Sequence, residues 1–185
     1  MIMCLFTTSP ALKCAFADII CYKILEQYPG VDVESHFLTP IVRMEYIIPS
    51  TIHDPKEFII HEMPKENVCR SLQRFILNTS NIMTLSRISI SNEALRTLQI
   101  LRNKCVNING TIDEKNVPKI YTTAAGVIHC YLDINIAKDK LKVWRNMDLP
   151  MVLVKCIIPK GSLVIPSYDM TEIGTKTLNL LEVIE

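Results

Sequence analysis

Two side chains capable of binding chemistry, His129 and Tyr131, lie two residues apart in the chain. The apolar run 127–132 predicts a β-strand, and residues two apart on a strand share a face. On that face the tyrosine ring could stack on a base, and the imidazole could hydrogen-bond a phosphate or a ribose. The alternative is an ordinary histidine at the edge of the core, bonded to a backbone carbonyl.

A second candidate region is the sequence Ile158-Pro159-Lys160-Gly161-Ser162. Proline second and glycine fourth predict a type I turn over its first four residues. Binding residues concentrate in such turns, although ordinary solvated lysines occur there too. Lys160 and Ser162 are therefore candidate ligand-binding residues.

Signatures of catalysis and of metal binding are missing from the sequence. There is no G-x-x-x-x-G-K loop, and His61-Glu62 lacks the second histidine of an H-E-x-x-H pair. His129 and Cys130 are neighbours on a predicted strand, so they would face opposite ways and could not easily share a zinc ion. The sequence thus predicts no catalytic residue, no metal and no cofactor.

Composition narrows the class of protein. The 185 residues include 20 basic and 19 acidic side chains, for a net charge of +1, which gives no overall field toward DNA, RNA or membranes. Seven cysteines without a C-x-x-C pair are typical of reduced thiols in a cytosolic core. The first six residues lack the features of a signal peptide, and no run reaches the ~18 apolar residues of a membrane span. We expect a cytoplasmic protein.

The elements that must position these residues follow from the hydrophobic pattern. Strands are predicted at 18–25, 37–48, 117–132, 151–158, 162–165 and 176–184, and a short amphipathic helix between 132 and 146. The segment 64–105 has apolar residues at helical spacing in two stretches, the second after the candidate caps Ser91 and Asn92. Strands at both ends and helices between them predict an α+β fold, a largely antiparallel sheet with a helical insertion packed on one face. The prediction is one domain, 1–185, with the insertion at 64–105.

Three stretches of the chain together resemble a diffuse group of small phage, prophage and bacterial proteins. The stretches are I-C-Y-K at 20–23 followed by Thr39-Pro40, G-V-I-H-C-Y at 126–131, and I-P-K-G-S at 158–162. The group has G-[FI]-H-x-[YC] in the second stretch, where this chain carries one additional residue. The resemblance covers about the first 50 and the last 65 residues and leaves out the helical middle.

This resemblance implies a phage-type accessory protein acting in the bacterial host cytoplasm. Some small phage proteins of this kind evade host immunity as sponges, which sequester nucleotide second messengers, cyclic nucleotides among them, without cleaving them. Such a protein needs stacking side chains and cations but no nucleophile, and we expect it to be a homo-oligomer. The expected ligand-binding residues are Tyr22, Lys23, Thr39, His129, Tyr131, Lys160 and Ser162.

Two other functions stay open at this stage. The 158–162 turn and Glu172 resemble elements of ADP-ribosyltransferases, although the characteristic arginine, Ser-Thr-Ser and paired-glutamate elements are not visible in order. Alternatively, the helical insertion 64–105 could present a surface that binds and inhibits a host protein.

Overall fold

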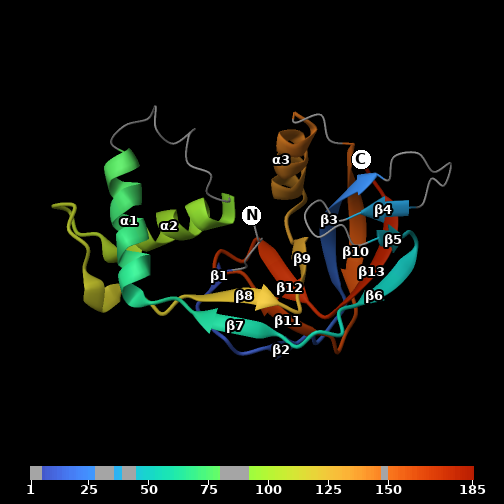
Figure 1. The fold of residues 1–185 in the computed structure, drawn as a ribbon, viewed down its shortest axis with the longest axis horizontal. Helices are drawn as coiled ribbons and strands as arrows, with labels where there is room; N and C mark the ends of the chain where they lie inside the picture. The colour runs from blue at the N-terminus through green and yellow to red at the C-terminus, as the bar shows by residue number, and fades with distance from the viewer. Residues whose placement is uncertain (1–5, 28–35, 39–44, 80–91, 147–149) are drawn as a thin grey trace.

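The structure is a computed structural model that describes residues 6–27, 36–38, 45–79, 92–146 and 150–185 (Figure 1). The strands are β1 (Phe6–Thr7), β2 (Lys13–Cys14), β3 (Ile19–Gln27), β4 (His36–Leu38), β5 (Glu45–Ile47), β6 (Ser50–His53), β7 (Ile59–Glu62), β8 (Tyr121–Ala125), β9 (Ile128–Tyr131), β10 (Met151–Ile158), β11 (Leu163–Pro166), β12 (Glu172–Thr175) and β13 (Thr177–Val183). The helices are α1 (Lys65–Thr79), α2 (Asn92–Cys105) and α3 (Ile134–Arg145), with a 3₁₀ turn at Glu114–Asn116. The predicted α+β class is confirmed.

Within the described residues the strands form a ten-stranded and a three-stranded sheet, and all their pairings are antiparallel. The large sheet has the order β2-β11-β12-β9-β3-β10-β13-β6, with β4 and β5 beside the end of β3. β3 and β10 pair along their whole length, from Ile19 opposite Ile158 to Glu26 opposite Met151. They form the centre of this sheet, and each strand contributes buried apolar residues to the clusters on both faces.

One face of the large sheet encloses a hydrophobic core. Strands on both sides of the central pair β3 and β10 contribute residues to it. The residues of β10 predicted to face one way, Val152, Val154, Cys156 and Ile158, all contact this core. Leu178 and Leu180 of β13 join it, as their alternation predicted. Since residues of β9 and β12 meet residues of β13 in one cluster, the sheet curls around this core.

The opposite face of β3, β9 and β10 is covered by α3 (Figure 1). The Asp133 carboxylate accepts hydrogen bonds from the backbone N–H groups of Asn135 and Ile136 and so fixes the start of the helix. Ala137 and Leu141 are fully buried against the sheet, and burial of a leucine side chain contributes about 2 kcal/mol. The amphipathic helix predicted between 132 and 146 is therefore present, with its apolar side inward.

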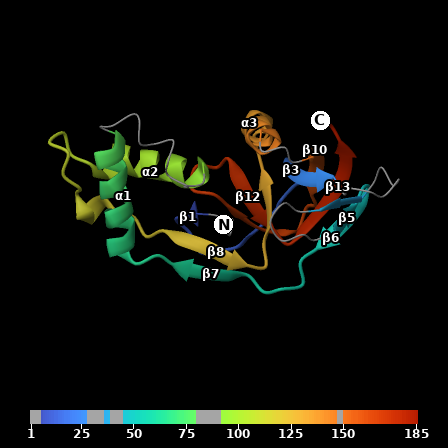
Figure 2. The ribbon, with the colours of Figure 1, turned by 45° about the horizontal axis from the view of Figure 1, so that its top comes forward.

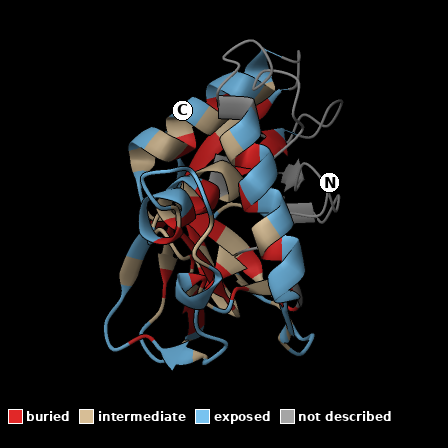
Figure 3. Cartoon of the chain, turned by 90° about the vertical axis from the view of Figure 1, so that its left-hand side faces the viewer, coloured by how far each residue is buried: buried red, intermediate tan, exposed pale blue. Residues whose placement is uncertain are grey.

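The helices of the predicted insertion lie beside the large sheet, next to the three-stranded sheet β1-β8-β7 (Figure 2). Their core is separate from the other two and contains Val68, Leu72 and Phe75 of α1 and Leu98, Leu101 and Cys105 of α2. The outward faces of these helices carry exposed residues, with buried residues beneath (Figure 3). The stripes that predicted the two helices are thus core residues, as expected.

Two local predictions need correction. The turn after β10 is shifted by one residue: the Ser162 N–H donates to the Pro159 carbonyl, and Gly161 has φ +87°, as in the third position of a type II turn. The strand expected over 117–132 is divided into β8 and β9 at Gly126, which has φ +72°. A Cβ on Gly126 would lie 2.1 Å from the Glu57 carbonyl oxygen, so the close crossing of the 54–58 loop requires glycine here.

Candidate functional site

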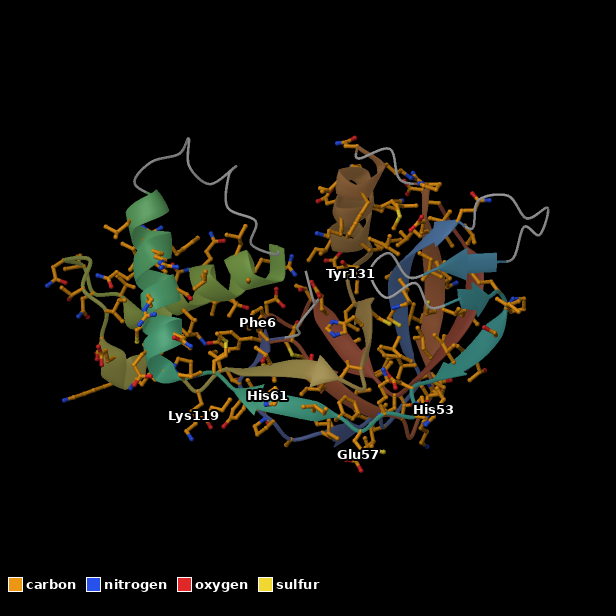
Figure 4. The ribbon with its side chains drawn as sticks, viewed as in Figure 1. Phe6, His53, Glu57, His61, Lys119 and Tyr131 are labelled. Atoms are coloured by element: carbon orange, nitrogen blue, oxygen red, sulfur yellow. The ribbon has the colours of Figure 1, made fainter. Side chains whose placement is uncertain are left out.

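The first group of predicted ligand residues comes together on the face of the large sheet that α3 partly covers. Tyr22 of β3 lies directly opposite Tyr131 of β9, and directly opposed residues of neighbouring strands share a face. His129 lies two residues before Tyr131, on the same face. Tyr131 is only 8% exposed, whereas Tyr22 and His129 are half-buried. Tyr22 is therefore the aromatic side chain that a ligand can reach, and Tyr131 is its neighbour on the adjacent strand. Tyr131 lies below α3 (Figure 4).

Lys23 belongs to the other face of β3, because Cys21 and Leu25 on either side of it contact the curled core. Its ammonium is buried and donates a hydrogen bond to the backbone carbonyl of His129 at 3.0 Å. A lysine that is 8% exposed acts on a ligand through the backbone and the local field, rather than by direct contact.

His129 is an unusual member of this group because its Nδ1 atom is buried and has no hydrogen-bond partner among the described residues. Burial, and then the nearby Lys23 ammonium, lower the pKa of His129 to about 4. The imidazole is therefore neutral at pH 7 and can either donate or accept a hydrogen bond.

A charged network lies next to this group, where the beginning of α2 meets the β11–β12 connection. The Arg96 guanidinium donates to Glu172 Oε1 at 2.8 Å, to Thr171 Oγ1 at 3.0 Å and, through Nε, to the Asp169 carboxylate. The carboxylates are almost covered, with 6% of the Asp169 side chain and 10% of the Glu172 side chain exposed, while Arg96 keeps 25%. This arginine thus connects the helical pair to the large sheet and leaves one edge toward solvent.

The two carboxylates differ in their electrostatics. Burial alone would raise the pKa of Asp169, but hydrogen bonds from Ser167, Arg96 and Thr171 outweigh it, and the pKa is lowered. The pKa of Glu172 is raised because burial outweighs its attraction to Arg96. Glu172 is consequently the member of the network that takes up a proton most readily.

A row of polar residues across the sheet connects the network to the tyrosines. Glu172 is opposite Tyr131, Tyr131 is opposite Tyr22, and Tyr22 is opposite Lys155. With neighbouring strands about 4.8 Å apart, Glu172 and Tyr22 are about 10 Å apart along this row. Lys140 of α3 adds a further cation near Glu172, where burial lowers the lysine's pKa.

The second group of predicted residues, Lys160 and Ser162, lies elsewhere. The Lys160 N–H donates to Asp18 Oδ1 at 2.8 Å, which places the turn beyond the start of β3. Because Tyr131 is opposite Tyr22 in an antiparallel pair, His129 is level with Ile24 of β3. Ile24 is six residues after Asp18 in the chain. At about 3.3 Å per residue, the turn at Asp18 is about 13 Å from Tyr22 along β3 and about 20 Å from the level of His129. Thr39 lies outside the described residues.

The residues that sequence reasoning missed are Arg96, Lys140 and Asp169, and Glu172 entered only through a family resemblance. Their spacing in the chain gives no signal, because three elements that are distant in sequence supply them. The one sequence hint was that Arg96 lies off the apolar stripe of α2.

The described residues contain no group of three His, Cys, Asp or Glu side chains placed to hold a metal ion. No helix in the described part of the chain is long and apolar enough to cross a membrane. No protein-family model, curated protein or solved structure matches this chain.

Proposed function

We propose that this protein binds and sequesters a small nucleotide-derived ligand without altering it, at the face formed by Tyr22, His129 and Arg96. The phage-type anti-defence role and cytoplasmic location that the sequence resemblance implies are part of this proposal. The observation that carries the site is the row Glu172–Tyr131–Tyr22, which places the half-buried Tyr22 about 10 Å across the sheet from Glu172, the carboxylate that Arg96 binds.

Each group in the row supports one part of such a ligand. The half-buried ring of Tyr22 offers a face for a base, since base–aromatic stacking tolerates any base. Neutral His129 can hydrogen-bond a ribose hydroxyl, and the exposed edge of Arg96 can pair with a phosphate. A phosphate here meets Glu172, whose raised pKa lets the carboxyl accept a proton when a second anion arrives.

The proposal is tested with substitutions in the two groups of predicted residues. Purified protein is screened by thermal shift against cyclic dinucleotides, cyclic trinucleotides, ADP-ribose derivatives and NAD, and the strongest ligand is titrated into variants. Tyr22→Leu keeps an apolar side chain but loses the ring, so we expect affinity to fall about tenfold or more. Lys160→Ala is the matched control, because Lys160 is exposed and its turn lies at Asp18, about 13 Å along β3 from Tyr22. Unchanged ligand affinity in Tyr22→Leu, or loss of binding in Lys160→Ala, would contradict the proposed site and indicate binding at the 159–162 turn.

A second candidate function is catalysis of the ADP-ribosyltransferase type. The observation that favours it is Glu172, a buried carboxylate with a raised pKa, held by Arg96 and opposite Tyr131. NAD turnover that is lost in Glu172→Gln and kept in Glu182→Gln would support it. Glu182 is a suitable control because it is exposed and paired with Lys155 on the same face. Recovery of intact ligand from the wild-type protein favours the binding function.

A further inference from the structure

The helical pair encloses a cavity that the nucleotide site does not use. A volume of about 470 Å³ lies between α1, α2 and the residue Phe6 of β1. Protein interiors are packed with few voids larger than a water molecule, whereas ligand pockets range from roughly 300 to 1,000 Å³. Phe6 lies between the helices and the sheets (Figure 4). This cavity therefore has the size of a ligand site.

The lining of the cavity is apolar apart from three side chains. Its apolar residues are Phe6, Met63, Val68, Phe75, Ala94, Leu98 and Leu101. Ser71, Arg74 and Thr97 provide the polar atoms. Each helix presents four lining residues, at i, i+3, i+6 and i+7 on α1 and at i, i+3, i+4 and i+7 on α2, so one face of each helix bounds the cavity. A ligand with a long apolar part fits this lining.

Thr97 provides an independent sign of a ligand. It is 4% exposed, and its Oγ1 atom is buried without a hydrogen-bond partner in the described structure. A helical threonine commonly bonds the carbonyl one turn back, which Thr97 does not do. A buried hydroxyl without a partner is destabilising, so one that lines a cavity is best satisfied by an occupant.

Arg74 fixes the charge of that occupant. It is exposed on α1 and lines the cavity, and it has no ion pair or side-chain hydrogen bond with the described residues. No other residue of the described lining is charged, so a single positive charge faces the site. Guanidinium groups match carboxylates in bidentate geometry.

We propose that the α1–α2 cavity binds an aliphatic carboxylate, with its chain between the helices and its carboxylate on Arg74. The Thr97 hydroxyl bonds an oxygen of the same ligand within the cavity. This site is independent of the nucleotide site, since it shares no residue with Tyr22, His129 or Arg96.

The test uses decanoate and 1-decanol, which have the same chain length and differ in charge. Calorimetric titration of the wild-type protein should show decanoate binding at least about tenfold more tightly than decanol. Arg74→Met should remove that preference and retain decanol binding. Arg70→Met is the control, because Arg70 is exposed one turn earlier on α1 and does not line the cavity. This variant should prefer decanoate over decanol as strongly as the wild-type protein does.

Two further variants probe the interior of the cavity. Thr97→Val keeps the shape of the side chain but removes the unpaired hydroxyl, so the ligand-free protein should melt at a higher temperature and bind decanoate several-fold more weakly. Ala94→Leu places extra volume in the cavity and should reduce the affinity for both probes. Absence of binding by the wild-type protein, equal affinity for both probes, or binding unaffected by both Arg74→Met and Ala94→Leu would overturn the proposal.

Discussion

Replacement of His129 by Asn should change how the stability of the protein depends on pH. The folded state holds His129 with a pKa of about 4, against about 6.5 in an unfolded chain. Between these values the unfolded state binds more protons than the folded state, so this histidine makes stability fall as pH falls from about 6.5 toward 4. Above pH 6.5 the imidazole is neutral in both states and contributes no pH dependence.

The size of the effect follows from the same two pKa values. From pH 7 to pH 5, linkage gives a loss of about 2 kcal/mol from this one group. Other titrating groups are common to both proteins, so their contributions cancel when wild type and variant are compared. The free energy of unfolding is measured by urea titration at pH 7 and pH 5. The wild-type protein should lose about 2 kcal/mol more than His129→Asn. Parallel losses in the two proteins would show that the ring is not held neutral, and would refute this account of the site.

Two further substitutions test the framework of the site, each by urea unfolding at pH 7. Arg96→Met removes the one ion-pair partner that Asp169 and Glu172 share in the described structure, so we expect a loss of about 2 kcal/mol. This is less than for a fully buried pair because Arg96 is partly exposed, and a change below about 0.5 kcal/mol would contradict the network. Gly126→Ala forces a Cβ to within 2.1 Å of the Glu57 carbonyl oxygen at a positive φ, so we expect a loss above about 2 kcal/mol, and a stability equal to wild type would contradict the close crossing.

The sequence predicted the elements whose side chains alternate or repeat. β10 has the predicted bounds, and the apolar side of α3 is the predicted one, because alternation and helical spacing reflect burial directly. The short strands β1, β2, β6, β7 and β12 were missed. The first two have two residues each, and β6 and β7 contain no buried residue, so neither length nor burial leaves a pattern in the sequence. All four residues of β12 are buried, and its sequence E-I-G-T therefore shows no alternation of apolar and polar residues.

The candidate site was only half accessible to sequence reasoning. His129 and Tyr131 were placed on one face correctly, because that relation depends on local strand geometry. The separation of Lys160 from His129 depends on the register between β9, β3 and β10, which no local pattern specifies. The Arg96 network likewise depends on how α2 meets β12, a contact between segments more than 70 residues apart.

The central claim is that the protein binds a nucleotide-derived ligand and leaves it intact. The most direct measurement incubates purified protein with the nucleotide panel, records the shift in melting temperature and identifies the bound molecule by mass spectrometry. Ligand in large excess over its dissociation constant stabilises the folded state by a few kcal/mol, which gives an easily detected shift. We predict a shift with at least one member of the panel and recovery of that member unaltered. No shift with any member would contradict the nucleotide proposal, and a chemically altered ligand would contradict sequestration without catalysis.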